Sequence, residues 1–291
     1  MTEADPVCAM VVTYNRQPLL RECLDAVLAQ TRPAERIMVV NNSTDDTADM
    51  LREHYPQVEV LETGENWACA GGFHDGLNRQ AATGEFGWYW LMDDDTVPTP
   101  TALEKMLGGL SRVGDLPPPA ILASKVLWTN GDIHRMGWPW TRWDQKELLE
   151  AFERQLLPLS ACTYVSMLVS DAAVKRYGVP IKHWFIWGDD IEWTTRLLKH
   201  EAGYLVPESI AVHKTKANYD PTQSNDVRFY YDVRNKLFML RGDNWTPKDR
   251  FWFAVMIART TMSYLVFNRF RPRNLWAVLR GMRDGVAQSP T

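Results

Sequence analysis

Three adjacent carboxylates follow an apolar run in "WYWLMDDDTVP", residues 88–98. In an extended segment alternate side chains point to the same side, so Asp93 and Asp95 can share a ligand while Asp94 faces elsewhere. Two carboxylates held this close repel each other unless a proton or a cation lies between them. A hard divalent ion such as Mg²⁺ or Mn²⁺ would neutralise the pair and keep coordination positions for phosphate oxygens. The pattern therefore favours a metal site over a solvated acidic turn.

The triplet does not fit the phosphatase pattern D-x-D-x-T, in which the first aspartate is a nucleophile. The threonine of that pattern would be Thr96, and the pattern then requires an aspartate at position 92, where the chain has Met92. A phosphatase or nucleotidyltransferase that uses the triplet therefore lacks its sequence pattern.

A second carboxylate pair, Asp189 and Asp190, lies in "HWFIWGDDIEWTTRLLKH", residues 183–200. The helix dipole favours carboxylates at a helix N-terminus, which alone explains one aspartate and Glu192. Partial burial beside Trp187 or Trp193 would also keep one carboxylate basic enough to accept a proton from a hydroxyl nucleophile. The pair is therefore a candidate catalytic group.

His213 follows the strand-like run "YLVPESIAV". An isolated histidine is more often a packing or surface residue than a ligand. Together with the carboxylates of Asp93 and Asp95, however, an imidazole would complete a mixed oxygen and nitrogen set that suits Mn²⁺. We therefore take His213 as the third candidate metal ligand.

Short β-branched runs alternate with helical patterns over the first hundred residues, which indicates βαβ units on a mostly parallel sheet. The predicted strands cover 7–15, 36–42, 58–63 and 86–93, and the helices cover 18–31, 43–55, 68–82 and 101–110. Ligands of open α/β sheets bind outside the carboxyl ends of the strands. Segments 13–16, 41–46, 66–72 and 93–95 should therefore converge there.

Six motifs, taken in order, resemble the inverting family-2 glycosyltransferases of the GT-A fold. They are "VVTYNR", "VVNNSTDDT", "ENWACAGGF", the D-D-D triplet, "WGDDIEWTTRL" and "VHK". The resemblance implies a Rossmann-like, mostly parallel central sheet with flanking helices. It is strongest to the bacterial galactofuranosyltransferases of cell-wall galactan assembly, with the polysaccharide rhamnosyltransferases next. Two positions depart from the family pattern: Asn41 stands where Asp is usual, and Ala68 where Gly is usual.

The resemblance implies a donor site at the matched positions. Asp93 and Asp95 with His213 would hold Mn²⁺ or Mg²⁺ against the donor diphosphate. Asp94 would face the donor ribose or sugar. The positions around the nucleotide, a UDP-sugar in preference to a dTDP-sugar, would be Thr13, Asn15, Arg16, Asn41 and Asn66.

The resemblance also implies the reaction, a direct displacement at the sugar carbon. Asp190, next to Asp189, would act as general base on a hydroxyl of a lipid-linked or cell-wall polysaccharide acceptor. The sequence leaves two other functions open: a dTDP-rhamnose-dependent transferase, and a sugar-nucleotide-binding protein that has lost catalysis and serves as an assembly partner.

Tryptophans are candidates for the acceptor site because flat aromatic faces pack against the C–H faces of sugars. Trp184 and Trp187 flank the carboxylate pair, and Trp140 lies in the Trp-rich segment 128–143. Packing in an irregular core is the alternative for the tryptophans of that segment.

Basic and aromatic residues mix along the chain after residue 240, with nine Lys/Arg against three Asp/Glu from Arg241 onward. This segment is too interrupted for a spanning helix. It fits helices that lie on an anionic membrane, or a helical pair packed on the catalytic domain. We expect a catalytic domain over 1–240, with a nucleotide-sugar half at about 1–110 and an acceptor half at about 111–240, and a helical region over 241–291.

Composition agrees with an enzyme of the reduced cytoplasm. The 291 residues are 45% hydrophobic, enough for a substantial core, and a net charge of −4 gives no general reason to expect nucleic-acid binding. The four cysteines are widely separated, which argues against a zinc site or a disulfide framework. The acidic N-terminus does not resemble a signal peptide. We expect a cytoplasmic protein, with peripheral contact at the inner membrane.

Overall fold

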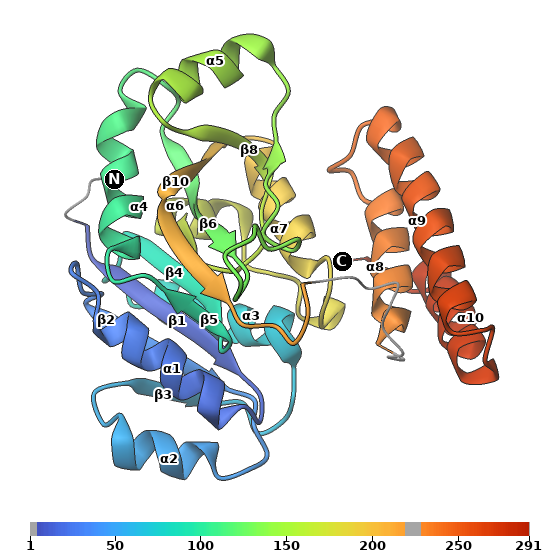
Figure 1. The fold of residues 1–291 in the computed structure, drawn as a ribbon, viewed down its shortest axis with the longest axis horizontal. Coiled ribbons are helices and arrows are strands. Elements are labelled where there is room, and N and C mark those ends of the chain that lie inside the picture. The colour runs from blue at the N-terminus through green and yellow to red at the C-terminus, as the bar shows by residue number, and fades with distance from the viewer. Residues whose placement is uncertain (1–4, 219–227, 291) are drawn as a thin grey trace.

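A parallel four-stranded block forms one side of the central sheet. The computed structural model describes residues 5–218 and 228–290. In the block, β1 (Val7–Thr13) pairs with β2 (Arg36–Asn41) and β4 (Trp88–Asp93), and β3 (Glu59–Glu62) adds to β2. Each crossover is helical: α1 (Gln17–Leu28), α2 (Thr47–His54) and α3 (Ala68–Ala81). The predicted βαβ units are confirmed, and the sheet carries helices on both faces (Figure 1).

Both faces of β1 are buried, which is why this strand is a continuous apolar run and does not alternate with polar residues. Residues Val7, Ala9 and Val11 pack in a core with α1, α2 and α4 (Ala102–Val113). The alternate residues Cys8, Met10 and Val12 pack in a second core with α3, α6 (Asp171–Tyr177) and α7 (Asp189–Leu198).

The other side of the sheet is mixed. The sheet continues from β4 through β9 (Met167–Ser170), β6 (Pro119–Leu127), β10 (Ala202–His213), β8 (Leu157–Ala161) and β7 (Trp140–Thr141). β9 runs antiparallel between β4 and β6, and β10 runs parallel to β6. The short β5 (Thr96–Pro98) pairs antiparallel with the end of β10. Helix α5 (Gln145–Glu153) and the 3₁₀ turn η1 (Lys182–Trp184) lie on the connections.

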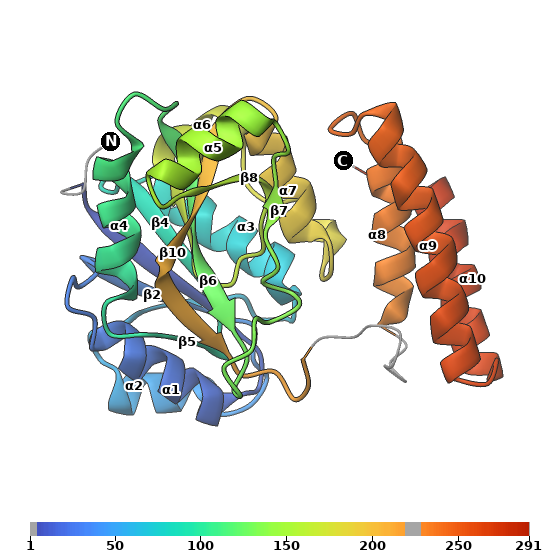
Figure 2. The ribbon, with the colours of Figure 1, turned by 45° about the horizontal axis from the view of Figure 1, so that its top comes forward.

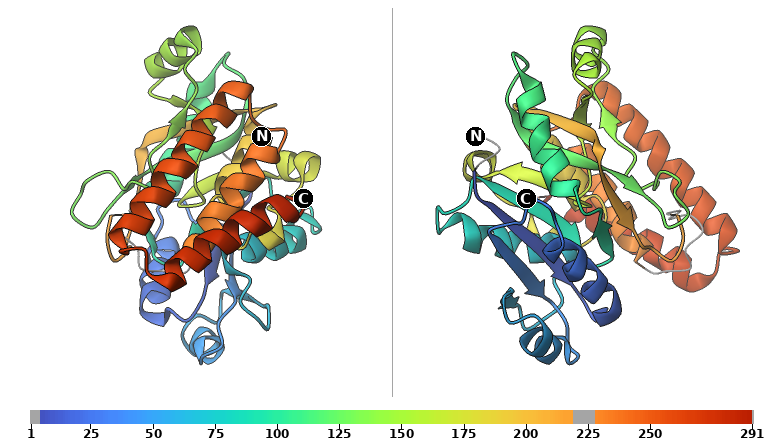
Figure 3. Two further views of the ribbon diagram at one scale, coloured as in Figure 1. Left: turned by 90° about the vertical axis from the view of Figure 1, so that its right-hand side faces the viewer. Right: turned by 60° about the vertical axis from the view of Figure 1, so that its left-hand side comes forward.

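Three helices follow the sheet: α8 (Phe229–Arg241), α9 (Pro247–Phe267) and α10 (Pro272–Ala287). They share a core in which the rings of Phe229 and Tyr264 stack at 3.9 Å. Thr246 and Asp249 form a capping box ahead of α9. We call α8–α10 the helical unit and the preceding elements the sheet unit. The helical unit lies beside the sheet unit (Figure 2) and covers one side of it (Figure 3).

The division expected after residue 240 falls inside α8, which packs against both α9 and α10. Among the residues that the structure describes, no helix combines the length and the apolar character needed to cross a membrane.

Candidate active site

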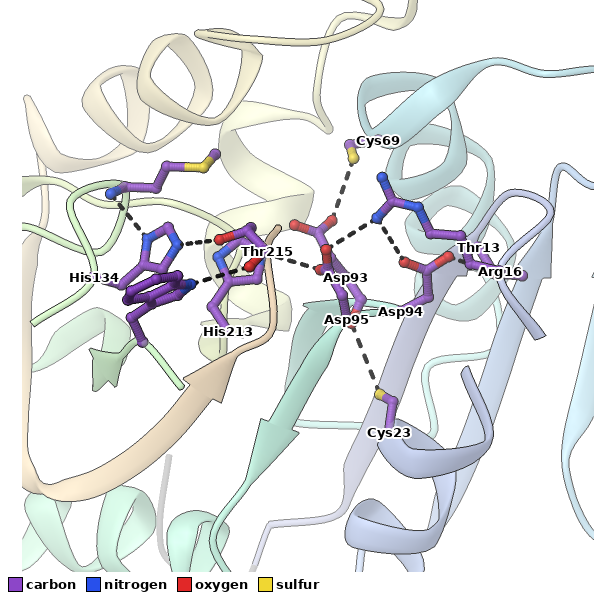
Figure 4. Close-up of polar contacts among 12 residues, drawn as sticks. Thr13, Arg16, Cys23, Cys69, Asp93, Asp94, Asp95, His134, His213 and Thr215 are labelled. Carbon is purple, nitrogen blue, oxygen red and sulfur yellow. Dashed lines mark hydrogen bonds and ion pairs between the residues drawn. The ribbon is translucent and has the colours of Figure 1, made fainter. Parts of the chain in front are cut away.

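The acidic triplet lies where β4 ends and the chain turns back into β5. The backbone amide of Asp94 still donates to Val12 of β1, at 3.2 Å. β5 then pairs with β10 so that Thr96 lies opposite His213. This pairing brings a residue from more than a hundred positions later to the tip of β4, where His213 Nε2 lies 2.9 Å from Asp95 Oδ1 (Figure 4).

Asp93, Asp95 and His213 form an acidic site able to hold a metal ion. Each offers one ligand atom, and these atoms lie within 4.8 Å of one another. His213 Nδ1 is buried without a hydrogen-bond partner. The other ring nitrogen, Nε2, faces the carboxylates, and an imidazole nitrogen beside two carboxylates matches the oxygen and nitrogen donors that a divalent cation such as Mn²⁺ accepts. The site that the sequence predicted at these three residues is therefore assembled in the fold.

Electrostatics distinguish the two carboxylates of this site. Burial, reinforced by the charge of Asp95, raises the pKa of Asp93 above its ordinary value. Burial also acts to raise the pKa of Asp95, but the hydrogen bond and charge of His213 outweigh it and lower that pKa. The bond to Asp95 likewise raises the pKa of His213 against the effect of its burial. A bound cation would favour the ionised form of Asp93 against both its burial and the charge of Asp95.

Asp94 is buried on the side of the triplet that faces β1. It accepts hydrogen bonds from Thr13 Oγ1 at 2.9 Å and from the Tyr14 amide at 3.3 Å. Arg16 Nη1 lies 3.3 Å from Asp94 Oδ1 and 2.9 Å from Asp95 Oδ2. Burial raises the pKa of Asp94 to about 7, and the charge of Arg16 opposes that rise. Thr13 and Arg16 thus bind the triplet directly in this structure.

The three asparagines expected around the nucleotide lie at the carboxyl edge of the sheet, Asn41 as the last residue of β2 and the other two in loops. The backbone of Asn15 is in the left-handed region (φ 52°), and its side-chain oxygen accepts from the Thr44 amide at 2.9 Å. Asn41 Nδ2 donates to the carboxylate of Glu62 at 3.0 Å. The side-chain oxygen of Asn66 accepts from the Ala68 amide at 2.8 Å. Asn15 therefore joins two loops, Asn41 joins the ends of β2 and β3, and Asn66 fixes the turn that leads into α3.

Ala68, which replaces the glycine usual in the family pattern, has φ 49°. Glycine adopts this left-handed conformation without steric cost, and alanine does not. The position therefore explains the preference of the pattern.

The second carboxylate pair opens α7 at the same edge. Asp190 Oδ1 accepts from the Ile191 amide at 2.8 Å. Burial raises the pKa of Asp190 to about 7, and the charge of Asp93 adds to the rise, so the two acidic groups interact across the edge. Asp189 is more deeply buried, and its Oδ2 has no hydrogen-bond partner. Burial and the charge of Asp190 raise the pKa of Asp189 well above its ordinary value.

The candidate acceptor tryptophans have different surroundings. Trp184 is buried in a core with Phe238, and its indole donates to the Pro290 carbonyl at 2.8 Å. It offers no open face to a sugar, because it fills the contact between η1 and α8. Trp187 is half-buried under the Arg228 guanidinium, at 5.9 Å.

Trp140 borders a cavity of about 410 Å³ between the sheet unit and α9. Its ring stacks on Phe253 of α9 at 6.0 Å. Arg142, Lys199 and Trp252 also line this cavity.

Two side chains at the triplet were not predicted from the sequence. The Cys69 thiol donates to Asp93 Oδ1 at 3.2 Å, and burial raises its pKa well above the ordinary value, so it stays a donor. The His134 ring lies 4.6 Å from the His213 ring, and its Nε2 lies 2.8 Å from Thr215 Oγ1. Cys69 lies within a motif that the resemblance used, which is a usable signal. His134 has no motif around it, and only the fold brings it to the site.

Comparison with known proteins gives the family and the fold. Residues 8–173 match the model described as "Glycosyl transferase family 2". The chain is 30% identical to the galactofuranosyltransferase GlfT1 of Mycolicibacterium smegmatis, over 68% of this chain and 67% of that protein. It is 29% identical to the N-acetylglucosaminyl-diphospho-decaprenol L-rhamnosyltransferase of Mycobacterium tuberculosis, over 73% of this chain and 76% of that protein.

A solved structure of GalNAc-T7 with UDP, GalNAc and Mn²⁺ superposes with a TM-score of 0.58 at 12% identity. The match covers 87% of this chain and 54% of that one, so this chain spans about half the length of that protein. The predicted GT-A architecture is confirmed at the level of the fold.

Proposed function

Because the chain belongs to glycosyl transferase family 2, we propose that it moves galactofuranose from UDP-galactofuranose to a hydroxyl of a lipid-linked or cell-wall polysaccharide acceptor. The donor is proposed from the similarity to GlfT1, whose name describes a galactofuranosyltransferase. The nucleotide half is proposed to be the parallel block, with Asn15, Asn41 and Asn66 in the loops that would surround it.

One observation supports this function above the others: two acidic groups with different environments face the same edge of the sheet. Asp93, Asp95 and His213 form one group, and Asp190 belongs to the other. A transferase of this kind needs both, because it must neutralise a leaving diphosphate and deprotonate an attacking hydroxyl.

Asp190 is the general base of the proposed reaction. Its carboxylate accepts the proton of the acceptor hydroxyl as the hydroxyl oxygen forms a bond to the anomeric carbon of the donor. The bond from that carbon to the diphosphate oxygen breaks, and its electron pair leaves with the nucleoside diphosphate. A pKa of about 7 suits this role, since the group is a stronger base than an ordinary aspartate yet still ionised in part at neutral pH.

Asp93, Asp95 and His213 would hold Mn²⁺ or Mg²⁺, which when bound offsets negative charge on the diphosphate. Arg16 pairs with Asp94 and Asp95 in this structure, so its positive charge also lies beside the proposed diphosphate position. Asp94, held by Thr13 and the Tyr14 amide, would face the donor ribose or sugar.

A thermal-shift screen tests the donor. Ligands that bind only the folded state raise the melting temperature, and at equal ligand concentration the tighter ligand raises it more. With Mn²⁺ present, we expect UDP-galactofuranose to raise the Tm more than UDP-glucose or dTDP-rhamnose, and transfer to a polyprenyl-linked glycan to follow. A larger shift with dTDP-rhamnose would instead support the second candidate, a rhamnosyltransferase, which the 29% identity to the mycobacterial enzyme favours. Donor binding without any transfer would support the non-catalytic alternative.

The surface of α9 and α10 supports the proposal that the acceptor is membrane-associated. From Phe251 to Ala287 the chain has six arginines and a single acid, Asp284. That acid is buried and accepts from Tyr230 at 2.8 Å. The exposed large apolar side chains on α9 and α10 are Phe251, Trp252, Val255, Met262, Val266, Phe267, Leu275, Trp276, Leu279, Met282 and Val286. Apolar side chains among cations, without opposing acids, suit a peripheral contact with an anionic membrane. We therefore propose that the protein works at a membrane surface.

Co-flotation with vesicles tests that contact. We expect the protein to float with vesicles containing phosphatidylglycerol and to stay in the dense fraction with phosphatidylcholine alone. The double variant Trp252→Ser/Trp276→Ser should lose flotation. Trp143→Ser removes a tryptophan that is 82% exposed in the sheet unit and should float like the unchanged protein. Absence of the unchanged protein from the anionic vesicle fraction would contradict the proposal.

A further inference from the structure

The backbone that leads into Asp189 and Asp190 is strained. Phe185, Trp187 and Gly188 have φ of 68°, 67° and 84°, so two of these three residues carry large side chains in the left-handed region. Non-glycine residues in sparsely populated regions are destabilising and persist only where the surroundings enforce them. We call residues 183–188 the lead-in segment. Its contacts should therefore explain how the carboxylate of Asp190 is oriented.

Two side chains of α8 hold the carbonyl oxygens of this segment. Asn235 Nδ2 lies 3.0 Å from the Trp184 oxygen, 2.9 Å from that of Ile186 and 2.8 Å from that of Trp187. Arg234 Nη2 donates to the oxygens of His183 and Trp184, each at 2.9 Å. Arg234 and Asn235 are 6% and 1% exposed, so water cannot readily replace either of them.

The two side chains also fix each other. Arg234 Nε donates to Asn235 Oδ1 at 2.9 Å, which leaves the Asn235 amide nitrogen turned toward the three carbonyl oxygens. An aspartate at this position would set carboxylate oxygen against carbonyl oxygen, and an alanine would leave buried acceptors without donors, which is destabilising.

Other residues of α8 also pack against residues 183–188. The ring of Tyr231 stacks on Phe185 at 4.9 Å. A Cβ at Gly188 would lie 2.7 Å from Met239 Cε, so the methionine side chain of α8 packs directly on this glycine. From the other side, the Ala70 amide of α3 donates to the Phe185 oxygen at 3.2 Å. The segment is thus enclosed between α3 and α8.

We propose that Arg234 and Asn235 are positioning residues for Asp190, and that α8 is a working part of the catalytic site. This inference rests on the proposed function, in which Asp190 is the base. A displacement of a reacting group by about 1 Å can cost on the order of 10²-fold in rate. Of the candidate metal ligands, Asp93 ends β4, Asp95 lies in the turn that follows and His213 ends β10, so donor and metal binding should survive loss of the pair.

The test compares Asn235→Ala and Arg234→Lys with a matched control, Asn268→Ala. Asn268 is also a buried asparagine of the helical unit, but its amide donates within α9, to the Tyr264 carbonyl at 2.9 Å. We expect Asn235→Ala to lower kcat about 10²-fold while donor KM and Mn²⁺ affinity by calorimetry change less than about twofold. Arg234→Lys keeps the positive charge but has a single donor nitrogen, so its kcat should lie between those of Asn235→Ala and the unchanged enzyme. Asn268→Ala should retain kcat.

Hydrogen exchange supplies a readout that does not depend on turnover. Amides of residues 184–191 should exchange faster in Asn235→Ala than in Asn268→Ala, while those of β4 and β10 stay protected. Exchange and kcat in Asn235→Ala equal to those of Asn268→Ala would overturn the positioning role. Asp190→Asn, measured in parallel, separates the two claims. If it is inactive while Asn235→Ala is normal, only the positioning fails; if it turns over normally, the base assignment fails with it.

Discussion

Asp95 contacts two basic side chains beside the triplet, His213 and Arg16. One of its carboxylate oxygens lies 2.9 Å from His213 and the other 2.9 Å from Arg16, so it is paired on both sides. Among the residues that the structure describes, the Cys69 thiol alone donates to the Asp93 carboxylate, and no cation pairs with it. The two carboxylates therefore differ, because the ionised form of Asp93 is the less stabilised of the two. A bound metal would stabilise ionised Asp93 more than ionised Asp95.

Metal dependence is the first prediction at the scale of residues. Asp95→Ala removes one of three ligands and should abolish both Mn²⁺ binding by calorimetry and sugar transfer, and excess EDTA should abolish transfer by the unchanged enzyme. Asp49→Ala is the matched control, because Asp49 lies exposed on α2, far along the chain from the triplet. Full transfer in excess EDTA would count against the metal site.

The pH dependence of turnover is the second prediction at the scale of residues. Asp190 must be ionised to accept a proton, and its pKa is raised to about 7, so kcat should fall as the pH decreases through that value. The charge of Asp93 contributes to the raised pKa, and a cation on Asp93 would place the acidic limb at or below about pH 7. We expect the limb in kcat measured with saturating donor. A kcat independent of pH between about 5 and 8 would contradict Asp190 as the base.

Residue types and spacing were enough to predict Asp93, Asp95 and His213 as a group, because an acidic triplet after a buried strand and a histidine after another strand both fall at the ligand edge. Arg16 was expected near the nucleotide, but its ion pairs with the triplet were not. His134 could not be predicted, since its place beside His213 depends on the path of the 128–143 segment, which has no regular period. The same holds for Trp184, whose burial depends on α8.

At the scale of elements, the close packing of α3 on β1 sets the position of Cys69, in the first turn of α3, and of the preceding loop that carries Asn66. Gly72 of α3 faces Val12, and a Cβ there would lie 2.6 and 2.8 Å from the two methyl carbons of that valine. A β-branched side chain cannot turn away easily, so the helix and the strand would have to separate.

Gly72→Ala should therefore destabilise the fold by about 1–3 kcal/mol, the usual cost of overpacking, measured by urea denaturation. Gly108→Ala is the matched control, because no atom lies within 4 Å of a Cβ at this position of α4. It should be neutral or stabilising by up to about 1 kcal/mol, since alanine is the better helix former. Equal stability of the two variants would show that α3 and β1 can move apart at little cost.

Strands and helices of the parallel block follow from hydrophobic period and turn residues, and each predicted element up to α4 is present. Strands β6, β8 and β9 were not predicted. β9 has four residues, too few for a pattern, and it pairs with β4 and β6, which lie far away in the chain. Such pairing is decided by long-range packing, which a local pattern does not contain.

At the scale of the whole molecule, the helical unit is joined to the site through α8. The sequence predicted aromatic, basic helices after residue 240, and α9 and α10 occur there. It did not predict that α8 would belong with them, because we expected the catalytic domain to extend to residue 240. We propose that the functional boundary lies before Phe229. A chain that ends after α8 would expose Phe229 and Val233, which α9 and α10 bury, so truncation at Arg241 should reduce stability as well as membrane contact.

Transfer by Asp190→Asn tests the central claim most directly. Asparagine has nearly the same shape as aspartate but cannot accept the proton, so the predicted result is a loss of about 10²–10⁴-fold in kcat with the donor that binds. Binding of UDP and Mn²⁺, measured by calorimetry on the same preparation, should stay within about twofold of the unchanged enzyme, because Asp190 is not one of the candidate metal ligands. Turnover near the unchanged value in Asp190→Asn, with donor and metal still bound, would contradict the account.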